Sequence, residues 1–329
     1  MRKTIHICLS VIDHLGDIGF ACELIRGFHE VYPGVYHFII WTDDLKKTEI
    51  FLEKNRGDIG SFDIFDTSNF WMSSQEVLFL LFHHTFPESL PESDILILRI
   101  DYLSFDHAWI AHHGSEHIAS NPWRQIIEII PSPLPWSGGL IGPMRRFLDR
   151  EILAKKYDLD PKKKWVSIFV YQDTLEERLL LENIGGTEVL IFWDIEVDIL
   201  WVKLMPFISL IEFSSFMRES AWAIVRGEVS LISALQFGTP LLWDMYHEIG
   251  GSHTTQGRDF VDWIEADDTY RDLFWKMNSQ EKWRLKLSDI DTYFSTHAWK
   301  KKNIEKNLVE EIQKYIDSFY ISLYSSSIK

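Results

Sequence analysis

The stretch from Leu9 to Phe20 constrains the fold most, because it joins two different hydrophobic patterns within a few residues. It closes an apolar run, residues 5–12, that has the length and the β-branched content of a buried strand. Beyond it, apolar residues recur every three or four positions from Ile18 to Val31, which predicts an amphipathic helix. The chain therefore begins with a strand, a short loop and a helix, the arrangement from which α/β domains are built.

Two carboxylates, Asp13 and Asp17, lie in this junction together with Gly16 and Gly19. The glycines permit a tight backbone path, and the first N–H groups of a helix have no partner inside it. Open α/β sheets bind their ligands at the carboxyl ends of their strands, which is where the junction falls. The two carboxylates either bind a ligand or have local roles, with Asp17 capping the helix and Asp13 shaping the turn. This stretch alone favours neither interpretation.

The alternation of strand-like and helix-like segments continues through the first half of the chain. Further strands are predicted at Tyr36–Trp41, Phe62–Phe65 and Ile95–Ile100, each of which is an apolar run of strand length. This β–α–β order predicts a parallel sheet with helices on both of its faces.

The same alternation restarts after a loop rich in proline and glycine at residues 131–139. Here Trp165–Tyr171 is predicted to be a strand, Leu175–Glu182 a helix and Glu188–Trp193 another strand. The second half of the chain is therefore expected to form an α/β domain of its own.

A linker and a returning helix complete the predicted organisation. The segment Asp158–Lys164, with its proline and three consecutive lysines, is predicted to join the two domains. Asn303–Tyr320 carries an apolar stripe and is predicted to be a helix that packs back on the first domain. The predicted N-terminal domain comprises residues 1–157 and 303–329, and the predicted C-terminal domain residues 158–302.

Composition excludes several classes of protein. A length of 329 residues suffices for two domains, and a formal net charge of −16 argues against binding to nucleic acids or anionic membranes. The two cysteines lack CxxC spacing, so neither a disulfide framework nor a thiolate metal site is expected. The N-terminal strand is too short for a signal peptide, and the apolar stretch Val77–Phe82 is too short for a membrane span. We expect a soluble cytoplasmic protein.

A second informative stretch runs from Trp222 to Tyr246. It predicts a strand, the loop Arg226-Gly227-Glu228, and a helix from Val229. The start of such a helix offers N–H groups and a positive dipole end to a phosphate, and the planar fork of Arg226 suits diphosphate oxygens. Glu228 and Ser230 have oxygens that accept hydrogen bonds from sugar hydroxyls. The alternative is ordinary α/β packing, with Glu228 at the helix start and Arg226 as its surface partner.

Together the two stretches resemble one family, EarP, the protein-arginine rhamnosyltransferases that modify elongation factor P. Residues 12–19, Ile-Asp-His-Leu-Gly-Asp-Ile-Gly, are similar to that family's Asp-Asn-Tyr-Gly-Asp-Ile-Gly, and residues 225–230, Val-Arg-Gly-Glu-Val-Ser, to its Val-Arg-Gly-Glu-Asp-Ser. The resemblance extends from residue 5 to about residue 250. Weaker similarities lie in the same order at residues 41–45, 101–104, 137–140, 206–207 and 243–246.

The resemblance implies a fold and a reaction. It implies the GT-B fold, in which two Rossmann-like domains face a central cleft and the C-terminal helix packs back on the N-terminal domain. It also implies an inverting transfer of L-rhamnose from dTDP-β-L-rhamnose to an arginine side chain of elongation factor P. This reaction uses no metal and no cofactor other than the nucleotide-sugar donor.

The same resemblance implies which residues act. An arginine guanidinium is protonated and a poor nucleophile, so two carboxylates that hold it and accept its proton would assist its attack. Asp13 and Asp17 are the implied pair, and their base and orienting roles are assigned to them jointly. Glu228 is implied as a further catalytic carboxylate. The residues implied in binding the nucleotide sugar are Gly16, Tyr171, Phe207, Arg226, Gly227, Glu228, Val229, Ser230 and Tyr246.

Three departures from the family pattern fall on the donor side. Val229 stands where the family has aspartate, Leu210 where it has glutamine, and Asp244 where it has histidine. Two alternatives therefore stand beside the arginine rhamnosyltransferase. One is a GT-B transferase of the same ancestry that uses another nucleotide sugar or acceptor, and the other is a catalytically inactive relative that binds a protein partner.

Overall fold

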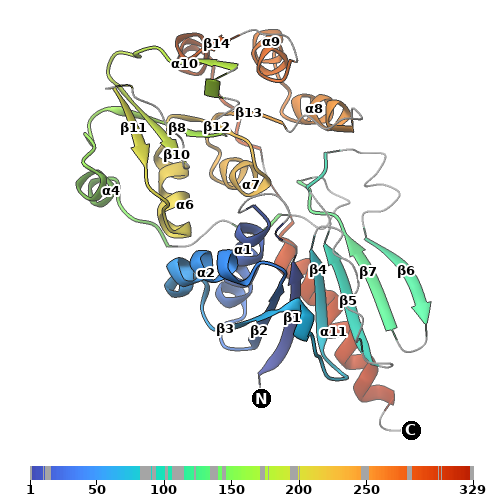
Figure 1. Ribbon diagram of the computed structural model, residues 1–329. Helices are drawn as coiled ribbons and strands as arrows, with labels where there is room; N and C mark the ends of the chain where they lie inside the picture. Colours follow the sequence, from blue (N-terminus) through green and yellow to red (C-terminus); the bar gives the residue numbers. More distant parts are fainter. Residues whose placement is uncertain are drawn as a thin grey trace. The chain divides into compact units, whose positions relative to one another are not determined.

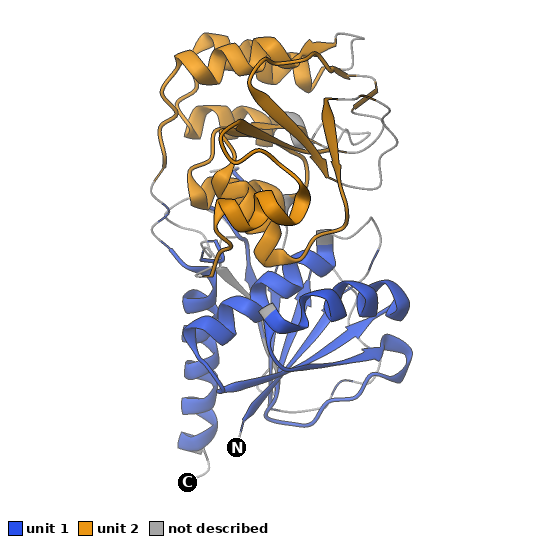
Figure 2. Ribbon diagram, turned by 90° about the vertical axis from the view of Figure 1, so that its left-hand side faces the viewer, with its two compact units in different colours: residues 1–142, 304–329 blue, residues 143–303 orange. Residues whose placement is uncertain are grey.

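The computed structural model divides the chain into two compact units, which are coloured separately in Figure 2. Unit 1 comprises residues 1–142 and 304–329, and unit 2 comprises residues 143–303. The structure describes residues 2–9, 11, 16–81, 90, 94–100, 103–105, 115–121, 124–133, 140–142, 146–170, 175–176, 178–192, 199, 201–245, 252–279, 284–302, 304 and 306–326.

Unit 1 is built on a seven-stranded sheet in the order β3-β2-β1-β4-β5-β7-β6 (Figure 1). Neighbouring strands are parallel, except that β6 runs antiparallel to β7. The bounds are β1 Lys3–Leu9, β2 Tyr36–Thr42, β3 Phe62–Asp66, β4 Val77–Leu81, β5 Ile95–Ile100, β6 Ser115–Asn121 and β7 Arg124–Ile129. The predicted strands of the first half are confirmed, and β5 has the predicted bounds.

Three helices pack on one face of this sheet. They are α1 (Gly16–Val31), α2 (Leu45–Ile59) and α11 (Leu308–Ser326). Gly27 of α1 allows close contact with α11, because a Cβ atom there would lie 2.8 Å from Val309 Cγ2. The C-terminal helix therefore belongs to unit 1, as predicted, although it begins five residues later than the sequence indicated.

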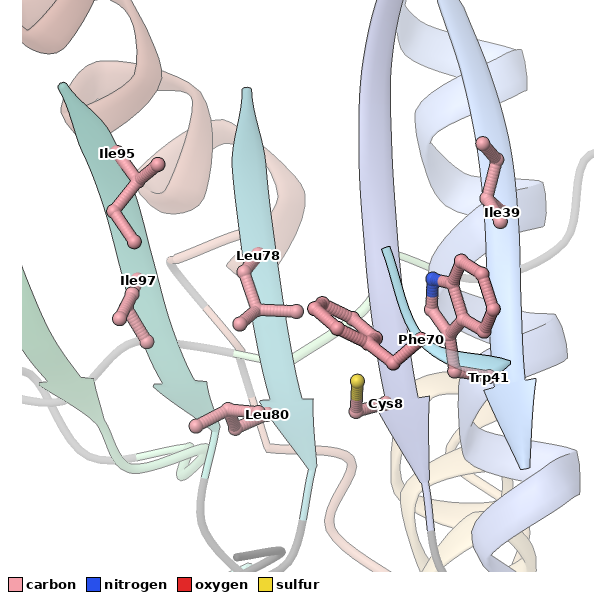
Figure 3. Packing of buried hydrophobic residues seen from close by; sticks show 8 residues of the cluster. All are labelled: Cys8, Ile39, Trp41, Phe70, Leu78, Leu80, Ile95 and Ile97. Carbon is pink, nitrogen blue, oxygen red and sulfur yellow. The ribbon is translucent and has the colours of Figure 1, made fainter. Parts of the chain in front are cut away.

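The opposite face of the sheet is covered differently. Its buried apolar side chains lie around Phe70 and Trp41 (Figure 3), and Phe70 follows the short 3-10 helix η1 (Thr67–Asn69). No helix within the described residues contributes to this cluster, although helices were expected on both faces. The members of the cluster are Cys8, Ile39, Trp41, Phe70, Leu78, Leu80, Ile95 and Ile97.

Unit 2 is built on a five-stranded parallel sheet in the order β11-β10-β8-β12-β13. Its strands are β8 Lys164–Phe169, β10 Thr187–Phe192, β11 Val202–Met205, β12 Trp222–Val225 and β13 Leu241–Trp243. Its helices are α4 Arg150–Tyr157, α6 Leu210–Glu219, α7 Glu228–Phe237, α8 Ser252–Trp263, α9 Asp268–Met277 and α10 Leu287–Thr296. Both units thus carry the parallel α/β architecture that the sequence predicted.

One predicted helix is shorter than expected. Leu175, Glu176 and Arg178 are helical, but Leu179–Leu180 forms β9, which pairs in parallel with β14 (Leu285–Lys286), and the two residues after β9 are irregular. Two-stranded pairing with a distant segment overrides the local helical pattern, as tertiary context commonly does.

The division between the units also differs from the predicted linker. The segment 158–164 lies inside unit 2, where Asp158 ends α4 in a left-handed conformation and Asp160 N donates to Glu188. Its proline and lysines thus form a compact turn between α4 and β8, and the units divide instead between Gly142 and Pro143.

None of the helices in the described part of the chain combines the length and the apolar content that crossing a membrane requires.

Candidate functional site

The sheet of unit 1 has its topological switch point at β1. The chain passes from β1 to β2 and β3 on one side and then returns to β4 and β5 on the other. Loops that leave adjacent strands in opposite directions open a crevice at the carboxyl ends of those strands, where doubly wound sheets bind ligands. The segment after β1, which carries the predicted acceptor carboxylates, begins at this point.

Asp17 lies in the first turn of α1, immediately after Gly16, the first residue of that helix. Fully buried side chains, among them Ile18 and Cys22, hold α1 in place after Asp17. A carboxylate in the first turn is favoured by the positive end of the helix dipole. Asp13 lies outside the described residues, so the joint role of the pair stays a prediction.

Asp43 is a residue of this region that the sequence reasoning did not identify. It follows β2, and its carboxylate oxygen Oδ1 accepts a hydrogen bond from the backbone N–H of Val11 at 2.7 Å. This bond fixes the chain just after β1, two residues before Asp13. The signal available in the sequence was an acidic residue two positions after the predicted strand Tyr36–Trp41.

The two cysteines close to this region are not candidate nucleophiles. Cys8 lies on β1 and Cys22 on α1, and both are fully buried. Burial raises the pKa of the Cys8 thiol, and burial together with the nearby charge of Glu23 raises that of Cys22. Both side chains therefore stay protonated and act as small apolar groups.

The sheet of unit 2 has its own switch point, between β8 and β12. The chain runs from β8 to β10 and β11 on one side and returns to β12 and β13 on the other. Arg226 and Gly227 follow β12 directly, so they lie at the carboxyl edge beside this switch point. Two hydrogen bonds hold the backbone there, from Asp244 N to Val225 O at 2.8 Å and from Trp243 Nε1 to Arg226 O at 3.2 Å.

The helix α7 begins at this edge. Gly227 is its N-cap residue and has no side chain with which to cap it, while Glu228 is its first residue. Ser230 is buried in the first turn, and its hydroxyl donates to Gly227 O at 2.7 Å, which leaves the oxygen lone pairs as acceptors. Val229 is partly exposed. The first-turn N–H groups have no partners within the helix, and such an arrangement favours an anion at a helix N-terminus.

A buried carboxylate accompanies Arg226. Asp244 follows β13 and is fully buried, and its two oxygens face two different arginines. Oδ1 accepts from Arg178 Nη1 at 2.9 Å, and Oδ2 lies 3.5 Å from Arg226 Nη1. The sequence reasoning noted Asp244 only as a departure from the family pattern and missed Arg178, since the segment around Arg178 was predicted to be an ordinary helix.

Phe207 lies apart from this group. It falls between β11 and α6, and 38% of its surface is exposed, which is high for a phenylalanine. Strand β11 is three positions from β12 in the sheet, a span of about 14 Å at ordinary strand spacing. The structure thus groups Arg226, Gly227 and Ser230, with Phe207 separate from them. Tyr171 and Tyr246 lie outside the described residues.

Comparison with known proteins identifies a family. The family described as Elongation-Factor P (EF-P) rhamnosyltransferase EarP matches residues 151–317, slightly more than half of the 329 residues. No curated protein sequence matches the chain.

Several solved structures are similar to the chain at low sequence identity. One, on EarP-mediated arginine glycosylation of translation elongation factor EF-P, has 13% identity and a TM-score of 0.49, over 97% of this chain and 95% of that one. Spinosyn rhamnosyltransferase SpnG has 10% identity and a TM-score of 0.47, over 97% and 96%. UDP-GlcNAc 2-epimerase from Methanocaldococcus jannaschii has 9% identity and a TM-score of 0.48, over 97% and 100%.

Proposed function

The chain belongs to the EarP family of glycosyltransferases, and on this premise we propose that it transfers L-rhamnose from dTDP-β-L-rhamnose to an arginine side chain of elongation factor P. The observation that carries the donor half of this proposal is the position of Arg226 at the start of α7, beside the switch point of the second sheet. A guanidinium fork and a helix N-terminus at one sheet edge favour a diphosphate group.

The departing nucleotide sets the chemistry of the donor half. When the bond between the sugar carbon and the diphosphate breaks, negative charge develops on the diphosphate oxygen. Arg226 and the first-turn N–H groups of α7 would stabilise that charge, and we propose that the reaction needs no metal for this purpose. Phe207, exposed at the end of β11, would provide an apolar wall for the base, and the span from β12 to β11 suits a nucleoside diphosphate.

The acceptor half has to activate a guanidinium. Asp17, in the first turn of α1, and Asp13 would hold the arginine fork by charge-assisted hydrogen bonds. As a nitrogen of the fork attacks the sugar carbon, one of the two carboxylates would accept the proton that this nitrogen loses. Attack from the side opposite the diphosphate inverts the configuration at that carbon.

The proposal is tested by the intact mass of elongation factor P after incubation with this protein and dTDP-β-L-rhamnose. We expect a gain of one deoxyhexose with the wild type and none with Asp17→Asn. Asp63→Asn is the matched control, because Asp63 is an exposed carboxylate of unit 1 within β3 whose described partner is His37, and it should transfer like the wild type. No gain with the wild type, while dTDP binds, would contradict the proposed acceptor.

A second candidate is a transferase of this family with another nucleotide sugar. One observation favours it: Leu210, where the family has glutamine, is only 4% exposed as the first residue of α6, so its side chain packs inward. A panel of dTDP, UDP and GDP sugars separates the two candidates. Preference for dTDP-rhamnose favours the first, and preference for another donor favours the second. Absence of both transfer and donor binding would indicate an inactive relative that binds a protein partner.

A further inference from the structure

The buried carboxylate of Asp244 lies between two guanidinium groups, those of Arg178 and Arg226. Asp244 is fully buried, and the side chains of Arg178 and Arg226 are 16% and 10% exposed. The contact with Arg178 Nη1 is a hydrogen bond of 2.9 Å, whereas Arg226 Nη1 lies 3.5 Å from the other carboxylate oxygen. Buried charges in proteins occur paired, and here one carboxylate pairs with two guanidinium groups, one at each of its oxygens.

The backbone that carries Asp244 is held from both sides. Asp244 N donates to Val225 O, which continues the pairing of β12 with β13. The side chain of Asn278, directly after α9, accepts from Met245 N at 2.7 Å and donates to Trp243 O at 2.9 Å. The backbone position of Asp244 is therefore set by the sheet and by the residue that ends α9.

We propose that Asp244 is a positioning residue: its carboxylate orients the guanidinium of Arg226 toward the donor diphosphate. The guanidinium of Arg178 in turn orients that carboxylate. The inference rests on the proposed function only in that Arg226 holds a diphosphate. It does not depend on which sugar is transferred or on which acceptor receives it.

The physical reason lies in the length of the arginine side chain. A free arginine samples many rotamers, and fixing it on a ligand costs side-chain entropy. An ion pair made before the ligand arrives removes part of that cost. A guanidinium has five N–H donors in a planar fork, so it can contact a carboxylate and a phosphate together. Sharing the carboxylate with Arg178 also weakens its hold on Arg226, which would otherwise be drawn away from the ligand.

Asp244→Asn is the variant that tests this arrangement. Asparagine has the same shape as aspartate but no charge. If its amide oxygen accepts from Arg178, its NH₂ group faces the guanidinium of Arg226, and two hydrogen-bond donors then oppose each other. We expect dTDP to bind about tenfold more weakly in calorimetric titration, the loss of a charge-assisted contact. Binding of thymidine, measured by ligand-observed NMR, should not change, because thymidine has no diphosphate for Arg226 to hold.

A matched control removes another ion pair in the same unit. Asp291, on α10, pairs with Lys164 at the start of β8 and accepts from Trp222 Nε1 at 2.7 Å, so it lies at the opposite, amino edge of the sheet. Asp291→Asn should bind dTDP as the wild type does, even if its thermal stability falls. A tenfold loss in this variant would overturn the inference, since any weakened ion pair would then have the same effect.

A double-mutant cycle separates positioning from general damage. If Asp244 acts through Arg226, Asp244→Asn should have no further effect on dTDP binding in an Arg226→Met background. An equal tenfold loss in both backgrounds, an equal loss of thymidine binding, or wild-type affinity in Asp244→Asn would each overturn the proposal.

A second variant covers the case in which Asp244→Asn does not fold. Arg178→Gln removes the guanidinium that shares the carboxylate with Arg226, so the carboxylate should hold Arg226 more strongly and draw it away from the ligand. Weaker dTDP binding with thymidine unchanged supports the proposal, and wild-type affinity for dTDP overturns it.

The donor proposed above and this inference fail in different ways. If the wild type binds UDP or GDP in place of dTDP, the proposed donor is wrong, and the same variants decide the role of Asp244 with that nucleotide. If the wild type binds none of the three nucleoside diphosphates, both are overturned.

Discussion

Two neighbouring carboxylates, Asp43 and Asp44, provide a sharp test of how the acceptor region is held. Asp43 accepts from Val11 N at 2.7 Å and so fixes the chain that leads to the predicted acceptor residues. Asp44 is the N-cap of α2 and accepts from Lys47 N at 3.0 Å. Replacing Asp43 by alanine removes its described hydrogen bond to the segment after β1, and replacing Asp44 removes its described hydrogen bond at the start of α2.

The magnitudes follow from these contacts. A hydrogen bond to a charged group contributes about 1.5–3 kcal/mol when buried, and the exposure of Asp43 reduces this to about 1 kcal/mol. If that energy holds the loop in its active position, Asp43→Ala should lower kcat/KM about fivefold. Loss of the N-cap in Asp44→Ala costs about 1 kcal/mol of stability, which lowers Tm by roughly 2–4 °C for a domain of this size.

Three measurements on the two variants decide the matter: rhamnosyl transfer to elongation factor P, thermal unfolding, and hydrogen exchange at the amide of Val11. Asp43→Ala should combine slower transfer with faster exchange at Val11, whereas Asp44→Ala should lower Tm and transfer normally. Normal transfer in Asp43→Ala despite fast exchange at Val11 would refute the reasoning. An equal loss of transfer in both variants would refute it as well.

Two further predictions concern stability. Gly27→Ala should lower the free energy of unfolding, measured in urea, by about 1–3 kcal/mol, because the new Cβ would lie 2.8 Å from Val309 Cγ2. Gly57→Ala is the control and should not destabilise the protein, because Gly57 has open space around it. Burial would raise the pKa of Glu212, but hydrogen bonds, foremost from Lys156, lower it below the usual 4.5, so its stabilising effect is present above that pH and is lost as pH falls through the lowered value. The free energy of unfolding of Glu212→Gln should therefore fall less than that of the wild type between neutral and acid pH. An equal fall in both proteins would contradict this.

The sequence was sufficient to predict the α/β alternation and the two strand–helix junctions at which the candidate sites lie. The strand Ile95–Ile100 has the predicted bounds, and α7 begins one residue before its predicted start. These features are local, because apolar runs, helical periodicity and the residues that start or end a helix act within a few positions of the chain. Arg226 was singled out because it directly follows a predicted strand, and Asp17 because it lies in the junction between a predicted strand and a predicted helix.

The tertiary structure alone determined how distant segments combine. Leu179–Leu180 is extended because Leu285–Lys286 pairs with it, more than 100 residues away, and the local pattern contains no sign of that partner. Asp244 gained its place between Arg178 and Arg226 in the same manner, since three separate segments meet at one edge of the sheet. Periodicity records which face of an element is buried but not which other element will cover it. Pairing and charge placement therefore depended on how the whole chain packs.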